Sequence, residues 1–526
     1  MSAIPFPYDY LAAEQISDWR QQLSLPINFI TVRDASERFS RALMHALGQI
    51  DDEQQATAYR AALPVLLRWA LVASETAMFL DAIGDKELAT KLPEYEYLSG
   101  RKTLSDCGIA TSNLLTVPYP RRPLARQLVW TGKWNRWWRF PRALIAPDIR
   151  AYNHNADLET AAKATSSYVR YDNVEHIYRE AVRTGARDKH TCWNHEQVQK
   201  LFAGAVQQAK LSPEMSQRLL TLMVARLSPV LSSTSKELHG LRGLRELPRD
   251  VWAGTGGYWA SRLVGLEIMR RGGTVRRFHH GYNIIVIPYI EGWTTIDLAP
   301  STHFVLPSQT AVERWRAEPV ADLLCAPPPT FEALRKTKSH GEPATRKLNA
   351  SSRRTRPRVL FAAEQIRGYR QWIPSWFPDA VTLDWTLRLG AALNSLPIEL
   401  VCRPHPEGIL QGRRHPLNDI APVPSANFEE LLPSADVVVL DGSNSRVFCL
   451  SLMSDKPVVL IDPGYKHVYA GLQPYLEGRC TILKLDYNER GLPEIDKRRL
   501  ANAVLDTKPP DPELVGKFRS VFGEDV

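Results

Sequence analysis

The chain has 526 residues, which is too long for one compact core and predicts two or three domains. Hydrophobic residues make up 44% and charged residues 23%, as is ordinary for a soluble globular protein, and the formal net charge of +9 suggests an anionic partner. The six cysteines contain no CxxC pair, which argues against a zinc site or a disulfide framework and favours a reducing compartment. The opening MSAIPFPYDY lacks the basic and apolar regions of a secretory signal, so we expect a cytoplasmic protein.

Residues 1–240 are predicted to be mainly helical and to contribute to an N-terminal domain. The segments NHEQVQKLFAGAVQQAK and EMSQRLLTLMVARLSPVL repeat apolar residues at three- and four-residue spacing. The most apolar stretch begins at Ala62 and is interrupted by Arg68 and Glu75. A membrane span needs about 20 mostly apolar residues, so this stretch predicts a buried helix instead.

Basic and tryptophan side chains alternate between residues 119 and 142, where no acidic residue occurs. Tryptophan favours the interfacial zone of a bilayer, and Arg and Lys are drawn to anionic lipid heads. Two interpretations stay open: an aromatic cluster packed in the core, or a contact with the inner face of the cytoplasmic membrane, which we favour. The residues of this predicted membrane contact are Trp130, Trp134, Trp137, Trp138 and Arg139.

Short apolar strands alternate with helices from Asp250 onward, as in DVWAG, GYWASRLVGLEIMRR, GTVRRFHHG and HFVLPS. This alternation predicts a parallel, Rossmann-like unit over residues 241–333. Residues 334–357 are basic and almost free of apolar side chains, as in an exposed linker. The runs RVLFAAE, PIELVCRPHP, DVVVLDGS, PVVLID and CTILKL make residues 358–526 a second Rossmann-like unit. We therefore expect an α/β fold in which two Rossmann-like domains face a cleft, with ligands beyond the carboxyl ends of the strands.

The stretch GTGGYWASR, residues 254–262, follows one predicted strand and precedes a helix. A dinucleotide fingerprint needs a third glycine where Trp259 stands, and the next strand provides no carboxylate for a ribose, so NAD is not expected. Backbone N–H groups at the helix N-terminus suit an anion or a sugar hydroxyl, whereas a turn that only packs the helix is the open alternative. The candidate acceptor or sugar contacts in this turn are Gly254, Thr255, Gly256, Gly257 and Tyr258.

The next predicted strand ends in HHGYN, residues 279–283. Only one of two adjacent histidines faces the cleft while the strand stays regular. A neutral imidazole there suits a general base or a phosphate contact, and a purely structural histidine is the alternative. The candidate catalytic residues are His279, His280 and Glu291, and Asp297 is a second nearby carboxylate.

Two loops of the second unit carry polar residues at strand ends, CRPHPEG at residues 402–408 and LDGSNSR at residues 440–446. Hydroxyl and free N–H groups where a helix begins make a compact anion site, although a helix cap explains the serines equally well. The candidate ligand contacts in these two loops are Arg403, His405, Pro406, Glu407, Asp441, Ser443, Asn444, Ser445 and Arg446. Glu364, which ends RVLFAAE, is a further candidate for contacting the acceptor or the sugar donor.

The run Arg403-Pro404-His405-Pro406, followed by FEELLPSADVVVLDGSNSRVFCLSLMSDKPVVLID, resembles the carboxyl-terminal half of GT-B glycosyltransferases of bacterial surface polysaccharide synthesis. The shared pattern is an HP motif, a strand ending in Asp-x-Ser, a short helix and Lys-Pro before the next strand. It is similar to sialyl- and Kdo-transferases that use CMP-activated sugars, and to CDP-glycerol transferases. Upstream, GTGGYWASR and RRFHHGYN are similar to the retaining β-Kdo transferases, so the resemblance covers about residues 250–465.

The resemblance implies that His405 and the loop Ser443–Ser445 hold the nucleotide and its phosphate, with acceptor and catalytic groups supplied by the first unit. A carboxylate is expected at the reacting centre of the β-Kdo group, whereas this sequence presents histidines, so the base and the stereochemistry stay open. We expect no metal or other cofactor, because no Asp-x-Asp pair stands at a strand end, and a helix dipole with basic groups can offset the charge of the leaving group.

Three functions fit these observations. The first is a glycosyltransferase that moves a sugar, Kdo from CMP-Kdo, to a lipid-linked or growing surface glycan such as capsule or lipopolysaccharide. The second is a CDP-glycerol or polyol-phosphate transferase of the same architecture. The third is a non-enzymatic binder of an anionic polymer, suggested by the positive charge. We rank it third and expect no nucleic-acid partner, because no known nucleic-acid-binding module is present.

Overall fold

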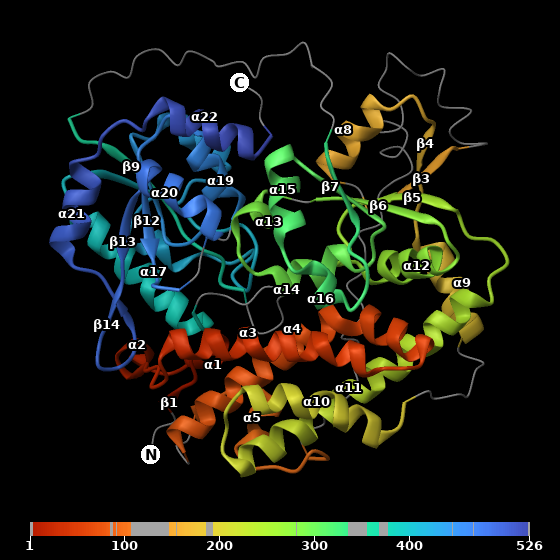
Figure 1. Ribbon diagram of the computed structural model, residues 1–526. Coiled ribbons are helices and arrows are strands. Elements are labelled where there is room, and N and C mark those ends of the chain that lie inside the picture. Colours follow the sequence, from red (N-terminus) through yellow and green to blue (C-terminus); the bar gives the residue numbers. More distant parts are fainter. Residues whose placement is uncertain are drawn as a thin grey trace.

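The protein is an α/β protein with two parallel sheets, of six and five strands, and a helical N-terminal region (Figure 1). This confirms the predicted fold class, and the two sheets are compatible with two Rossmann-like units. The computed structural model describes residues 4–84, 88–90, 92–106, 147–153, 155–185, 193–279, 281–334, 355–367, 377–443, 445–465 and 468–523. The predicted linker, 334–357, is thus described only at its ends.

The first sheet has the strand order β4-β3-β5-β6-β7-β8, and all its neighbouring strands are parallel. The strands β5, β6 and β7 match the predicted ones. The strands β3 and β4 lie in the region predicted to be mainly helical. The sequence did not predict them, because strands of four and three residues are too short to show a two-residue period. The bounds are β3 Ile149–Tyr152, β4 Val169–Tyr171, β5 Asp250–Ala253, β6 Thr274–Phe278, β7 His303–Leu306 and β8 Thr330–Ala333.

Helices and short turns connect these strands. They are α8 Ala156–Ala164, α9 Glu175–Gly185, α12 Trp259–Arg270, α13 Asn283–Val286, α14 Ile290–Trp293, the π-helix η3 Thr294–Leu298, α15 Gln309–Ala317 and α16 Val320–Leu324.

The second sheet has the strand order β10-β9-β11-β12-β13, again with parallel neighbours. Its central strands are apolar and buried along their length, as is typical of a parallel sheet covered on both faces. That is why the sequence predicts all five of them. The bounds are β9 Arg358–Ala362, β10 Glu399–Arg403, β11 Val437–Leu440, β12 Val458–Asp462 and β13 Thr481–Lys484.

The remaining elements of this half are α17 Asp379–Asn394, η4 Pro416–Asp419, α18 Phe428–Leu431, η5 Leu432–Ser434, α19 Arg446–Met453, η6 Ala470–Leu472, α20 Gln473–Arg479, α21 Lys497–Leu505 and α22 Pro512–Val521, with a small antiparallel pair, β14 Asp486–Tyr487 and β15 Pro493–Glu494.

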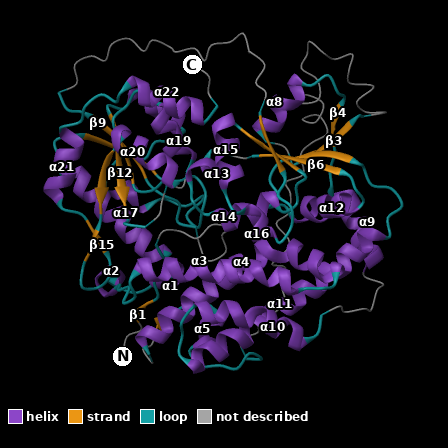
Figure 2. Cartoon of the chain, in the orientation of Figure 1, coloured by secondary structure: helices purple, strands orange, loops and turns teal. Residues whose placement is uncertain are grey.

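The N-terminal helices form a layer along one side of both sheets (Figure 2). An apolar window of α4 has a mean hydropathy of 1.4, enough for a membrane span by length and composition, but 89% of that window is buried inside the protein. This burial agrees with the predicted buried helix. The elements are β1 Ile4–Pro5, α1 Tyr10–Ala13, α2 Trp19–Gln22, α3 Phe29–His45, η1 Ala46–Gln49, α4 Glu53–Ile83, β2 Leu88–Ala89, α5 Pro93–Leu98, α10 His195–Gln208 and α11 Pro213–Arg242.

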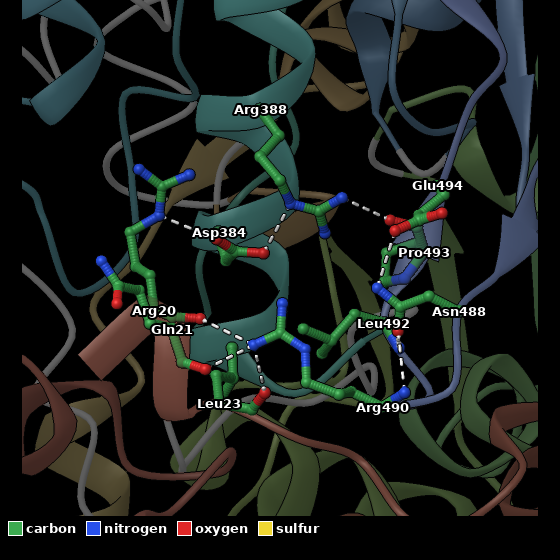
Figure 3. Close-up of polar contacts among 10 residues, drawn as sticks. All are labelled: Arg20, Gln21, Leu23, Asp384, Arg388, Asn488, Arg490, Leu492, Pro493 and Glu494. Carbon is green, nitrogen blue, oxygen red and sulfur yellow. Dashed lines mark hydrogen bonds and ion pairs between the residues drawn. The ribbon is translucent and has the colours of Figure 1, made fainter. Parts of the chain in front are cut away.

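Polar contacts bind the chain before α3 to the second half of the molecule, which is the part that contains the five-stranded sheet (Figure 3). The Nε atom of Arg20 lies 2.7 Å from Oδ1 of Asp384, on α17. Arg490, in the turn between β14 and β15, donates from Nη1 to the carbonyl oxygen of Gln21 at 2.5 Å. In return, the backbone N–H of Leu25 donates to the carbonyl oxygen of Arg490 at 2.7 Å. Backbone groups from both segments are thereby satisfied at one place.

The same helical layer also contacts the first half of the molecule, which is the part that contains the six-stranded sheet, and the two halves contact each other directly. Arg262, on α12, donates from Nε to the carbonyl oxygen of Ala61, on α4, at 2.7 Å. At the other end of the chain, the rings of Tyr282 and Phe522 lie 5.2 Å apart, so the segment after α22 packs against the loop after β6. The helical layer and the end of the chain therefore both hold the two sheets together.

Replacing Gly491 with Ala is expected to weaken the contact between the chain before α3 and the turn that contains Arg490. Gly491 has a φ of +71°, and a Cβ there would lie 1.9 Å from the carbonyl oxygen of Leu25. Gly412 has a φ of +75° with no atom within 4 Å of such a Cβ, so Gly412→Ala measures the backbone strain alone. We expect Gly412→Ala to lower the free energy of unfolding, measured in urea, by about 1 kcal/mol and Gly491→Ala to lower it by about 2–4 kcal/mol. Equal losses would show that the chain before α3 does not depend on this close approach.

Candidate functional site

Polar side chains from three neighbouring strands gather at the carboxyl edge of the second sheet. Glu364 follows β9, His405 follows β10 and Asp441 follows β11, and β9 lies between the other two in the sheet. Because parallel strands all end at the same edge, the loops after them converge there. This edge is the candidate site, and the predicted nucleotide contacts in the second half belong to these loops.

Asp441 joins the loops after β9 and β11. Its Oδ1 accepts the backbone N–H of Glu364 at 2.6 Å, and its Oδ2 accepts the hydroxyl of Thr386, from α17, at 3.2 Å. A Cβ on Gly442 would lie 2.8 Å from Oε2 of Glu364, so the Glu364 carboxyl group lies directly beside that backbone. The structure therefore places Glu364 among the predicted nucleotide contacts. The sequence grouped it with the acceptor or sugar contacts.

Both carboxyl groups titrate near neutral pH. Burial raises the pKa of Glu364 to about 8, with Arg367 lowering it and Asp441 raising it further. Burial likewise raises the pKa of Asp441 to about 7, against the hydrogen bonds from Glu364 and Thr386. Two adjacent carboxyl groups of this kind share protons at pH 7 instead of both ionising. Such perturbed groups at a strand edge are typical of functional sites.

His405 is neutral at pH 7 and holds its proton on Nε2. Burial lowers its pKa, and Arg367 adds to the effect while Glu407 opposes it. The Nδ1 atom accepts the backbone N–H of Glu407 at 3.2 Å, so the ring proton must be on Nε2. This tautomer can donate a hydrogen bond to a phosphate or hydroxyl oxygen.

The loop before α19 is built as a helix cap. The hydroxyl of Ser445 accepts the backbone N–H of Phe448 at 3.3 Å, and Ser443 is fully buried. The capping alternative raised by the sequence is therefore present for Ser445. Arg446 is 64% exposed and lies 3.6 Å from Glu429, so it can turn toward a ligand. Of the other predicted contacts, Arg403 is half-buried, Pro406 and Glu407 are exposed, and Asn444 lies outside the described residues.

The glycine-rich turn of the first half is occupied by a carboxylate of the protein itself. Oδ1 of Asp297 accepts the backbone N–H of Gly256 at 2.7 Å and the hydroxyl of Thr255 at 3.0 Å. A Cβ on Gly254 or on Gly256 would lie 2.0 Å from the carbonyl oxygen of Asn153 or of Ile296, respectively. The packing alternative therefore accounts for both glycines. The N–H of Gly257 is also used, by Thr255 at 3.1 Å, and Tyr258 is partly exposed at the start of α12.

Two buried arginines lie beneath this turn. Arg277 donates from Nη1 to the carbonyl oxygens of Gly254 and Thr255, each at 3.2 Å. Arg262 donates from Nη1 to the carbonyl oxygen of Ile296 at 3.0 Å. Burial lowers the pKa of Arg262 to about 9 and that of Arg277 to about 10, and the charge of Asp297 raises both. The turn is thus the centre of a buried, charged network.

The predicted catalytic residues of the first half are held by different elements. His279 is 1% exposed, with Nε2 lying 3.2 Å from Oδ2 of Asp157, on α8, and Nδ1 lying 3.3 Å from the carbonyl oxygen of Gly281. Glu291 is also 1% exposed, and its Oε1 accepts a hydrogen bond from Nε of Arg41, on α3, at 2.6 Å. Burial raises the pKa of Glu291, and Arg41 opposes that shift. His280 lies outside the described residues.

A polar connection between the two halves runs through α3 and was not predicted. Arg41, which binds Glu291, also lies 2.6 Å from Oε1 of Glu37, and the hydroxyl of Tyr465 donates to Oε2 of Glu37 at 2.9 Å. Tyr465 follows β12, so this connection joins the carboxyl edge of the second sheet to α14 of the first half. The i,i+4 spacing of Glu37 and Arg41 was the only signal of it in the sequence.

The predicted membrane contact, Trp130, Trp134, Trp137, Trp138 and Arg139, lies outside the described residues. Within the part of the chain that the structure describes, no group of three or more His, Cys, Asp or Glu side chains is arranged to hold a metal ion. No protein-family model matches the chain, and a search of curated proteins gives no significant match.

Removing the carboxylate of Asp297 is expected to destabilise the first half. Asp297→Ala leaves the N–H of Gly256 unpaired and removes the negative charge nearest to Arg262 and Arg277. We expect a loss of about 3 kcal/mol in urea unfolding, because it leaves buried charges uncompensated. Thr255→Val, which removes the hydrogen bond to the same oxygen and the one that Thr255 accepts from the N–H of Gly257, is expected to cost about 1–2 kcal/mol. A loss for Asp297→Ala no larger than for Thr255→Val would show that the carboxylate is not what holds the turn.

Proposed function

We propose that the protein is a glycosyltransferase that moves a sugar from a nucleotide donor, CMP-Kdo being the favoured donor, to a lipid-linked or growing surface glycan. The observation that carries this proposal is the convergence of Glu364, His405 and Asp441 at the carboxyl edge of the second sheet. Ligands of parallel α/β sheets bind beyond that edge. The resemblance of residues 250–465 to GT-B transferases, and the presence of two parallel sheets, agree with the proposal.

The proposed donor site offers positive and hydrogen-donating groups to a phosphate. Nε2 of His405 donates one hydrogen bond, and the start of α19 adds its dipole and the mobile charge of Arg446. When the bond between the sugar and the CMP phosphate breaks, these groups stabilise the charge that develops on the leaving phosphate. This part of the mechanism requires no metal.

For the acceptor side we propose Glu291 as the base that takes the proton of the attacking hydroxyl. Burial raises its pKa, which makes the carboxylate a stronger base than an exposed one, although Arg41 opposes that shift. Both ring nitrogens of His279 face protein oxygens, which favours a positioning role for that residue. The connection through Arg41, Glu37 and Tyr465 supports this proposal, because it links Glu291 to the edge of the second sheet.

A CDP-glycerol or polyol-phosphate transferase is the second candidate, because the same phosphate contacts serve a CDP-linked donor. The two are separated by supplying each donor in turn. An initial thermal-shift panel of CMP, CDP, UDP, GDP and NAD tests the nucleotide site itself. A ligand at 100 times its dissociation constant adds roughly 2.7 kcal/mol of stability. Stabilisation by CMP supports the proposal, and stabilisation by NAD alone contradicts it.

Replacing His405 with Ala is expected to weaken CMP binding about tenfold, because one hydrogen bond to the phosphate is lost. His415 is the matched control. Its Nδ1 accepts the N–H of Leu417 at 3.1 Å, as Nδ1 of His405 accepts that of Glu407, and burial alone lowers its pKa. We expect His415→Ala to bind CMP like the unmodified protein in isothermal titration. If both variants, or neither, lost affinity, His405 would not be a donor contact.

The proposed membrane contact is tested by replacing Trp137 and Trp138 with Ala. Because Trp favours the interfacial zone of a bilayer, we expect less co-sedimentation with anionic liposomes and a nearly unchanged Tm. A large fall in Tm with normal liposome binding would favour the core-packing interpretation of the segment 119–142.

A further inference from the structure

We infer that the carboxyl group of Glu364 binds the pyrimidine base of the donor, acting as a hydrogen-bond donor and acceptor to the polar edge of cytosine. This inference rests on the proposed function, and it assigns to one residue the recognition of the base. It also orients the donor, with the base beside β9 and the phosphate over the start of α19.

The position of Glu364 leaves one oxygen for a ligand. The side chain is 8% exposed, and its carboxyl group lies beside Gly442, where a Cβ would come within 2.8 Å of Oε2 and 3.3 Å of Oε1. Oε1 is buried and has no hydrogen-bond partner within the described part of the chain, since Nη2 of Arg367 is 3.9 Å away. A buried polar atom without a hydrogen bond is costly, so a site of this kind is completed when a ligand supplies the partner.

The charges around Glu364 select a neutral part of the donor. Asp441 lies against Glu364 from the end of β11, Arg367 lies in the same loop as Glu364, and both act on its pKa. Asp379 and His405 interact with Arg367 in turn. The negative charge that this pair carries at pH 7 is centred on Asp441, the group with the lower pKa, and it repels the phosphate and the carboxylate of a sugar such as Kdo. The base and the ribose are the neutral parts that remain.

The hydrogen-bonding pattern of a neutral carboxyl group matches the base. It presents one O–H donor beside one C=O acceptor, whereas an ionised carboxylate presents acceptors only. Cytosine presents the N3 acceptor beside the N4 amino donor, so the neutral group makes two hydrogen bonds where the ionised group makes one. With a pKa of about 8, Glu364 is mostly neutral at pH 7 and ionises above pH 8. Binding of the base is therefore lost as the pH rises through that value.

The experiment is isothermal titration of the full chain with CMP and with ribose 5-phosphate, which lacks the base. Glu364→Ala is expected to weaken CMP binding about tenfold or more, and ribose 5-phosphate binding less than about twofold. Glu364→Gln keeps one donor and one acceptor, so it should retain CMP affinity within about threefold at pH 7. The matched control is Glu399→Ala. Glu399 is half-exposed at the opposite end of β10, beside Arg358, and its removal should leave CMP binding unchanged.

The pH profile separates recognition of the base from a structural role. Between pH 7 and pH 9.5 the CMP affinity of the unmodified protein should fall about fivefold or more, while that of Glu364→Gln stays level. Equal losses for CMP and ribose 5-phosphate in Glu364→Ala would assign the residue to the ribose and overturn the inference, as would unchanged CMP binding. If Glu364→Ala failed to fold, the pH profile of Glu364→Gln would decide. If the unmodified protein bound ribose 5-phosphate or another nucleotide but not CMP, or bound none of them, the proposed function itself would fail.

Discussion

The burial of Arg262 is the constraint on which the first half of the molecule depends. A guanidinium group removed from water must replace its hydration with hydrogen bonds, and Arg262 does so with carbonyl oxygens of α4 and η3. These bonds fix α12 against the helical layer on one side and against η3 on the other. Asp297, in η3, then reaches the turn before α12. The loop after β5 is therefore positioned by contacts with other parts of the protein, before any ligand binds.

The sequence predicted the elements whose signals are local. The strands β11 and β12 are buried apolar runs, and the loops after β9, β10 and β11 carry the polar residues of the candidate site. It did not predict what depends on distant partners. The glycines before α12 suggested a ligand because their partner, Asp297, lies 41 residues away from Gly256. The strands β3 and β4 were too short to show a period, and the approach of Asp441 to Glu364 follows from the pairing of β11 with β9.

The two halves differ in whether the polar side chains at their strand ends have partners within the protein. In the first half, Asp297, Glu291 and His279 each face a polar partner within the protein before any ligand arrives. In the second half, the carboxyl groups of Glu364 and Asp441 lie beside each other, and Arg367 opposes the raised pKa of Glu364. This contrast supports assigning the nucleotide to the second half. At its strand edge, Oε1 of Glu364 is buried without a hydrogen bond in the described part of the chain, so a ligand there can supply the partner.

The attachment of the chain before α3 to the turn at Arg490 also has a consequence for biosynthesis. The contacting residues Gln21 and Arg490 are 469 residues apart, so the first part of the chain leaves the ribosome long before its partner exists. Contacts of such long range form late, because the intervening chain must be ordered first. During translation the helical layer must therefore remain without its final support on the second half.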